Sequence, residues 1–145
     1  MRRRINVMLA TLMLAIPVMA STPMNALAAP DISVYTNGPE ARWNYLTVIQ
    51  GSLDINDGIA HINTRAAADG SGVNKMKVTV DLQRISSNGS VKTIKTWTTT
   101  KSSFIASLTK DWAVDENYSY QIVITADAYI DGSLVETASH TVEQS

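Results

Sequence analysis

The chain has 145 residues and no cysteine, a length that allows one domain. Without cysteine, disulfides, thiolate metal sites and cysteine nucleophiles are excluded. Of the 12 Lys and Arg, three lie in residues 1–28, where no Asp or Glu occurs. Residues 29–145 therefore carry nine basic and 13 acidic residues, a net charge of −4. This balance disfavours nucleic acid and anionic membranes as partners.

Residues 1–28 are predicted to be a cleavable signal peptide. Arg2, Arg3 and Arg4 precede an apolar run over residues 7–20, which is shorter than the roughly 20 residues needed to span a bilayer. Small residues favour cleavage after Ala28, with Ala20 as the alternative. The arginines also permit a twin-arginine signal, although general secretion is simpler. We therefore expect a secreted, extracellular protein with no stable membrane anchor after cleavage.

The remainder is expected to be a flexible N-terminal arm over residues 29–42 and a β-sandwich domain over residues 43–145. Short runs of β-forming residues alternate with turn clusters, and no stretch keeps a helical period. The fold class predicted from this pattern is all-β, an immunoglobulin-like antiparallel sandwich of about seven strands.

The expected strands follow the apolar alternation. The first is divided by a bend or bulge at Gly51, and the fifth continues irregularly through Trp112 and Val114. Val80 and Ile122 lie mid-strand on apolar faces and are predicted to be core residues of facing or adjacent strands. The sequence does not decide which alternate residues of the last strand face the core. The strands are expected at residues 43–55, 60–67, 75–83, 91–100, 104–114, 118–126 and 134–142, with turns at 56–58, 86–90, 115–117 and 131–133.

The segment Tyr120-x-Ile122-x-Ile124-x-Ala126 follows a polar turn and resembles the penultimate strand of fibronectin type III and immunoglobulin-like domains. The resemblance implies a sandwich with a tyrosine corner, in which the hydroxyl of Tyr120 or Tyr118 bonds to backbone a few residues upstream. The cysteine pair of many immunoglobulin domains is absent.

On a larger scale, residues 39–142 resemble small secreted proteins of Gram-positive Firmicutes that carry a domain of unknown function. The resemblance rests on short segments, Pro39-Glu40-Ala41-Arg42-Trp43, Val91-Lys92-x-Ile94-Lys95-x-Trp97 and Tyr120-x-Ile122 among them. It implies export and a sandwich fold, and it assigns no functional residue.

Candidate catalytic and metal sites have simpler structural interpretations. His61 and His140 are the only histidines and lack metal-ligand spacing. The Gly-x-Ser-x-Gly motif of many serine hydrolases is absent. The paired acids at 115–116 and at 54 and 57 fall in predicted turns, and the calcium-like run 54–58 lacks a distal glutamate. We therefore expect no enzyme, no metal and no cofactor.

The aromatic residues give the one positive indication of function. Tryptophan rings exposed on a sandwich can stack on sugars or anchor a protein partner, whereas buried ones fill a core. Trp43 and Trp112 are the candidate ligand-binding residues, because they lie at the domain edge and in an irregular stretch. The expected function is a secreted binding or adhesion module for carbohydrate or protein. A bacteriocin-like, envelope-interacting factor is the alternative, and a hydrolase is the least favoured.

Overall fold

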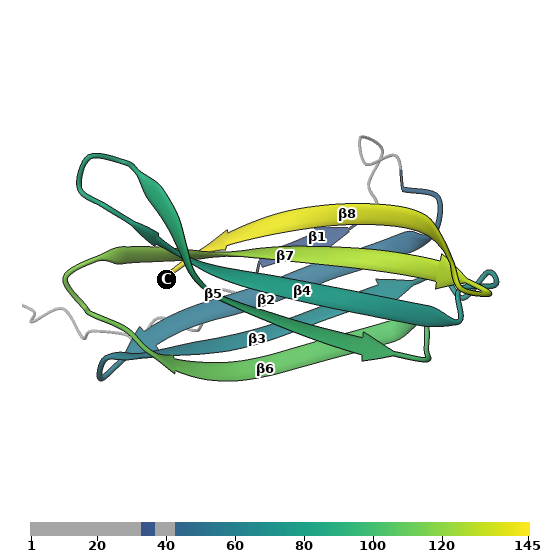
Figure 1. Ribbon diagram of the computed structural model, residues 1–145, viewed down its shortest axis with the longest axis horizontal. Coiled ribbons are helices and arrows are strands. Elements are labelled where there is room, and N and C mark those ends of the chain that lie inside the picture. The colour runs from purple at the N-terminus through teal and green to yellow at the C-terminus, as the bar shows by residue number, and fades with distance from the viewer. Residues whose placement is uncertain (1–32, 37–42) are drawn as a thin grey trace, which may run out of the picture.

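The computed structural model describes residues 33–36 and 43–145, and for residues 33–36 the backbone alone is considered. The predicted signal peptide and both cleavage sites lie outside the described residues. Within them the chain forms eight antiparallel strands and no α-helix (Figure 1). Accordingly, the described part of the chain has no helix long and apolar enough to cross a membrane.

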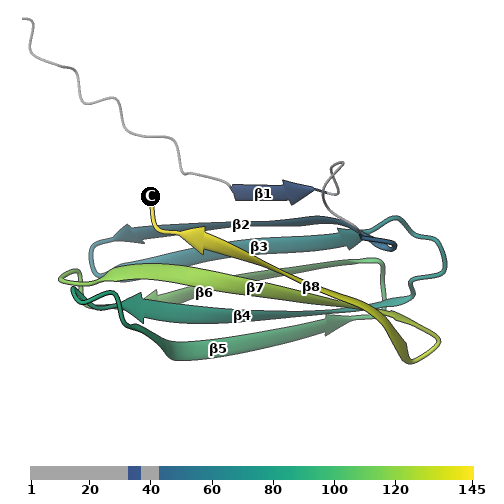
Figure 2. The same ribbon diagram turned by 90° about the horizontal axis from the view of Figure 1, so that it is seen from above.

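The strands form two four-stranded sheets, ordered β1-β2-β3-β6 and β5-β4-β7-β8. We call these sheet A and sheet B. The strands run along the long axis of the molecule, and the sheets lie as two layers (Figures 1 and 2). The prediction of an all-β antiparallel sandwich is confirmed. The strands are β1 (Ser33–Thr36), β2 (Leu46–Asn56), β3 (Ile59–Ala68), β4 (Lys75–Ile85), β5 (Val91–Lys101), β6 (Ile105–Ala113), β7 (Ser119–Ile130) and β8 (Ser133–Glu143).

The strand order is a variant of the immunoglobulin arrangement. With β2 to β8 taken as seven successive strands, the constant-type arrangement would pair the fourth strand, β5, with β6. Here β5 pairs with β4 in sheet B instead. Strand β1 adds a further edge strand beside β2, within the segment expected to be an arm.

The core lies between the sheets and is built from alternate residues of the central strands. Val80 pairs across β4 and β7 with Ile124, and Leu82 with Ile122, and all four are fully buried. The prediction that Val80 and Ile122 are core residues of adjacent strands is confirmed. On β8, Val142 pairs with Ile122, which places Ala138, His140 and Val142 on the core side and settles the parity of that strand.

Two details of strand geometry differ from the predictions. Strand β2 is continuous, and its irregularity lies between Leu46 and Val48, so the bend expected at Gly51 was wrong. The residue is glycine for another reason: a Cβ there would overlap Ile124 Cδ1 of the opposite sheet. Strand β6 keeps a regular ladder with β3 as far as Ala113, so the prediction that this strand runs irregularly through Trp112 was also wrong.

Two tight hairpins fix the register of the outer strands. Asp57 and Gly58 join β2 to β3 with φ angles of 50° and 72°, and Asp131 and Gly132 join β7 to β8 with 49° and 84°. Two successive positive φ angles define the type I′ turn that matches the twist of paired strands. The turns predicted at both places are confirmed.

Candidate functional site

The candidate site lies at the open edge where β5 of sheet B faces β6 of sheet A. Trp112 pairs with the buried Ala60 and is therefore on the core side of sheet A, yet it remains 38% exposed. The reason is that β6 is an edge strand, so the opposite sheet covers it incompletely. Trp97 on β5 meets it edge to face, with ring centroids 5.8 Å apart and planes at 76°. The pair bridges the two sheets and holds the Trp112 indole in a fixed orientation.

Polar groups surround the exposed indole. Lys95 Nζ lies 4.5 Å from the centre of the Trp112 ring, a cation–π contact. Beside the ring is a shallow depression of about 270 Å³, lined by Ile59, Asp111, Trp112 and Ala113. Asp111 Oδ1 is 2.8 Å from Nδ1 of the exposed His61. Small-molecule sites usually enclose about 300–1,000 Å³, so this one suits a ligand that lies on the surface.

Trp43, the other predicted ligand-binding residue, lies elsewhere. It is partly buried and packs against the core just before β2 begins. Trp112 pairs with Ala60, which pairs in turn with Ile55 near the far end of β2. The eleven residues of β2 span about 35 Å. The structure therefore does not bring Trp43 and Trp112 into one site.

The two histidines do not converge. His61 is exposed on the outer face of sheet A, where it pairs with Asp54 and Asp111, whereas His140 lies on the core side of β8 opposite Ile124. Burial lowers the pKa of His140 below its ordinary value. Within residues 33–36 and 43–145, no group of three or more His, Asp or Glu is arranged to hold a metal ion.

Of the four acids predicted to lie in turns, Asp54 lies within β2 instead, opposite His61, and the other three have turn functions. Asp57 occupies a left-handed position of the β2–β3 hairpin. Asp115 Oδ1 accepts hydrogen bonds from the backbone and side-chain N–H groups of Asn117, which lower the pKa of the Asp115 carboxyl. Glu116 Oε1 accepts from the Gly58 amide at 2.6 Å and so ties the β6–β7 turn to the neighbouring hairpin. These contacts give all three residues a structural role in the turns.

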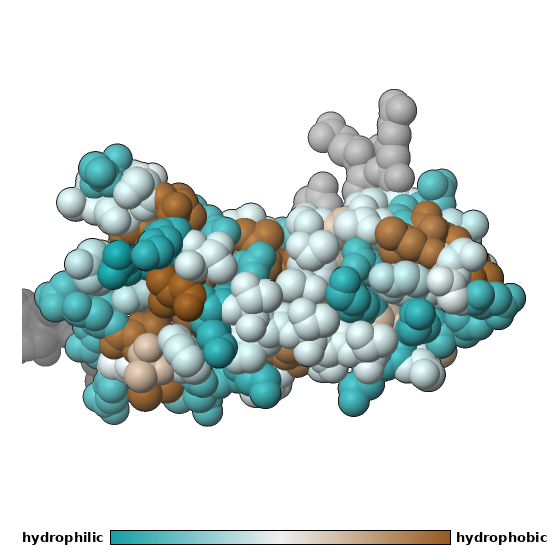
Figure 3. Space-filling view, in the orientation of Figure 1, coloured by the Kyte–Doolittle hydropathy of each residue, from teal (hydrophilic) through white to brown (hydrophobic). Residues whose placement is uncertain are grey.

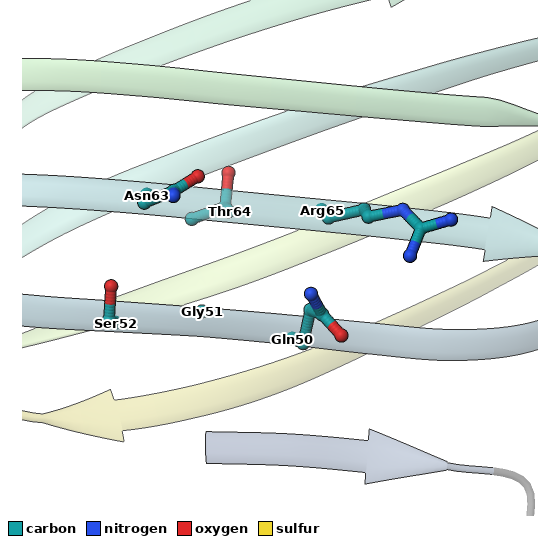
Figure 4. Close-up of a pocket in the computed structure, with 6 residues that line it drawn as sticks. All are labelled: Gln50, Gly51, Ser52, Asn63, Thr64 and Arg65. Carbon is teal, nitrogen blue, oxygen red and sulfur yellow. The ribbon is translucent and has the colours of Figure 1, made fainter. Parts of the chain in front are cut away.

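The outer faces of the sheets are polar. On sheet B, one row of hydroxyl residues crosses all four strands. Figure 3 shows this face of the molecule, which is pale or teal through its middle and has apolar patches toward the ends. On sheet A, side chains of β2 and β3 surround a small depression of about 60 Å³ (Figure 4). The row on sheet B is Thr98, Thr79, Thr125 and Ser139, and the depression on sheet A is lined by Gln50, Gly51, Ser52, Asn63, Thr64 and Arg65. The hydroxyl row and the depression contain no aromatic residue, although the outer face of sheet B carries the Tyr129 ring beside Lys75.

The sequence made Trp112 a candidate ligand-binding residue but did not indicate which residues would contact it. Lys95 and Trp97 are two residues apart in a strand, so alternation already placed them on one face. Their contact with Trp112 depends on how β5 and β6 meet across the two sheets, which alternation does not reveal. No model of a known protein family matches the chain, and no curated protein does either. The functional argument therefore depends on the site itself.

Proposed function

We propose that this chain is an exported, non-catalytic binding module that recognises an extracellular polysaccharide through Trp112. The observation that carries the proposal is the partly exposed indole, held edge to face by Trp97 and bordered by polar side chains. A sugar ring presents C–H groups on its faces and hydroxyls around its rim. An aromatic ring with nearby hydrogen-bonding groups complements both features, and here Lys95 over the ring and Asp111 in the lining of the depression supply those groups.

A sugar fits this surface better than a protein partner does. Protein interfaces use contiguous apolar patches with aromatic anchors at the centre. The large exposed apolar residues of the described chain are instead scattered: Val91 begins β5, Phe104 lies between β5 and β6, Trp112 is near the end of β6, and Leu134 follows the β7–β8 turn. Such isolated groups suit a narrow ligand that contacts one ring.

Affinity electrophoresis tests the proposal, with the protein run through gels that contain polygalacturonate, alginate, hyaluronate, dextran or xylan. At least one polysaccharide should retard the protein. Trp112→Ala should weaken that binding by roughly 1–3 kcal/mol, and because the ring also packs against Trp97 the variant should lose some stability, so binding is compared at a temperature at which both proteins are folded. The matched control is Phe104→Ala, which removes another exposed ring and should not affect binding. No retardation by any of the five, or equal losses in both variants, would refute the proposal.

Export is a separate part of the proposal, and it rests on the arginines and apolar run of residues 1–28. N-terminal sequencing of the protein from culture medium should give Ala29 as the first residue. Ser21 would move the cleavage site to the alternative position. A protein retained in the membrane with Met1 intact would contradict export.

A further inference from the structure

The open edge beside Trp112 concentrates positive charge. The core-side positions of β5 and β6 are identified by their pairing with buried residues of β4 and β3. Three of these positions carry a charged residue, and each of the three is a lysine. The core-side positions are Lys95, Trp97, Thr99 and Lys101 on β5, and Ala106, Leu108, Lys110 and Trp112 on β6.

The lysines follow the edge over a length suited to a polymer. Lys95 and Lys101 are six residues apart on β5, which corresponds to about 20 Å, or several sugar rings. Between the Trp97–Trp112 pair and the β5–β6 connection, a second shallow depression of about 230 Å³ lies across both strands. It is lined by Thr98, Thr99, Ser107, Leu108, Thr109 and Lys110. The Trp112 site therefore continues into a hydroxyl-lined surface with a lysine in it.

The charge of this edge is opposite to that of the chain as a whole. Residues 29–145 carry a net charge of −4, whereas the core-side positions of β5 and β6 carry three positive charges. Asp111 is the one acid within β5 and β6. It lies on the outer face of sheet A, where it pairs with His61. A ligand with regularly spaced negative charges complements such an edge.

From this arrangement, and resting on the proposed function, we infer that the polysaccharide is acidic and carries carboxylates, which Lys95, Lys101 and Lys110 contact along the β5–β6 edge while Trp112 contacts a sugar ring. Lysines on edge strands also prevent edge-to-edge association of sheets. If that were their entire purpose, replacing them would change oligomeric state and leave ligand binding intact. The two roles are therefore separable by experiment.

The experiment compares polygalacturonate with its fully methyl-esterified form, which has the same backbone without the charge. The full mature protein should bind the acid form more tightly, and the difference should shrink as salt screens the charges. Lys95→Gln and Lys110→Gln should each weaken binding of the acid form about two- to fivefold, and the double variant on the order of tenfold. Binding of the esterified form should stay unchanged in Lys110→Gln, and in Lys95→Gln, whose ammonium also borders the Trp112 ring, it should fall less than binding of the acid form. The matched control is Lys75→Gln, because Lys75 also lies over an aromatic ring, that of Tyr129, but on β4.

The outcomes distinguish this inference from the proposed function. Both forms could bind equally, with this binding lost in Trp112→Ala and kept in the lysine variants. That result would overturn the inference that the polysaccharide is acidic and would leave the proposal of polysaccharide binding intact. Polyglutamate, a polyanion without sugar rings, should bind more weakly than polygalacturonate. Equal binding of polyglutamate, with no effect of Trp112→Ala, would overturn both. Lysine variants that self-associate in sedimentation but bind normally would show that the lysines serve only to protect the edge.

Discussion

Gly51 shows how a single residue sets the distance between the sheets. Its hydrogen occupies space that a methyl group would share with Ile124 Cδ1. Gly51→Ala should therefore destabilise the protein by about 1–3 kcal/mol through overpacking, measured by urea denaturation. Shortening the opposing side chain in Gly51→Ala/Ile124→Val should recover part of the loss, giving a favourable coupling energy. Additive effects of the two changes would contradict the contact.

Tyr120 is the tyrosine corner that the resemblance to fibronectin type III domains implied, with Tyr118 as the alternative. The buried Tyr120 donates its hydroxyl proton to the Asp115 carbonyl at 2.9 Å and accepts from the Asp115 amide at 3.1 Å. Tyr118 instead stacks under the Arg84 guanidinium, 4.3 Å from its ring centre.

Tyr120→Phe should cost about 1–3 kcal/mol in thermal or urea unfolding, because both backbone groups of Asp115 lose a partner. In Tyr118→Phe the ring remains beneath Arg84, so stability should hardly change. If the two substitutions had equal effects, the Asp115 contact would not be the source of the corner's stability.

Among the strands, the long alternating segments were the easiest to predict. Residues 75–83 and 118–126 keep a period of two because each strand has one side in the core, and both became central strands of sheet B. The turns at Asp57-Gly58 and Asp131-Gly132 were equally evident, since few residue pairs tolerate two positive φ angles. The regularity of β6 was not evident, because its solvent-exposed end carries no apolar alternation and depends on pairing with β3.

The start of β2 is joined to the far sheet by one carboxylate. Glu136 on β8 accepts hydrogen bonds from the amides of Asn44, Tyr45 and Leu46 at 2.7, 2.9 and 2.6 Å. These donors lie 90 to 92 residues away in sequence, so no local pattern could reveal the contact. Charge-assisted bonds of this kind are stronger than neutral ones and connect the two sheets at this end of the sandwich.

Glu136→Gln should destabilise the protein by roughly 1.5–3 kcal/mol, because the amide has one acceptor oxygen and adds N–H donors facing N–H donors. Hydrogen exchange should accelerate first at the amides of Tyr45 and Leu46. The control is Glu143→Gln, an exposed acid on the same strand, and it should be close to neutral. Equal protection of both amides in wild type and Glu136→Gln would contradict the role of Glu136.

At the scale of the whole molecule, the sequence predicted the sandwich but not the partner of each edge strand. Apolar alternation reports which side of a strand is buried. It would be the same for β5 beside β4 in sheet B or beside β6 in sheet A. The placement of β5 beside β4 is what brings Lys95 and Trp97 to Trp112. Trp43 and Trp112 were both candidates for ligand binding, and the length of β2 separates them in the fold.

The stability of the whole fold should depend on the protonation of His140. Burial holds the pKa of His140 below its ordinary value of 6.5, so the folded state favours the neutral ring. The contribution is complete above about pH 6.5 and is lost as pH falls through the lower, folded-state pKa. Melting temperature should therefore fall on mild acidification, and the fall should be smaller in His140→Gln. An unchanged profile in His140→Gln would contradict the assignment.

The three tryptophans provide the most direct test of where a ligand binds. Each indole N–H gives its own signal in a ¹H–¹⁵N NMR spectrum, and Trp97 and Trp112 lie at the β5–β6 edge while Trp43 lies toward the other end of the sandwich. Titration with oligogalacturonate should move the Trp112 signal most and the Trp97 signal next, and should leave Trp43 in place. Movement of Trp43 alone, or of none of the three at saturating oligosaccharide, would contradict binding at the β5–β6 edge.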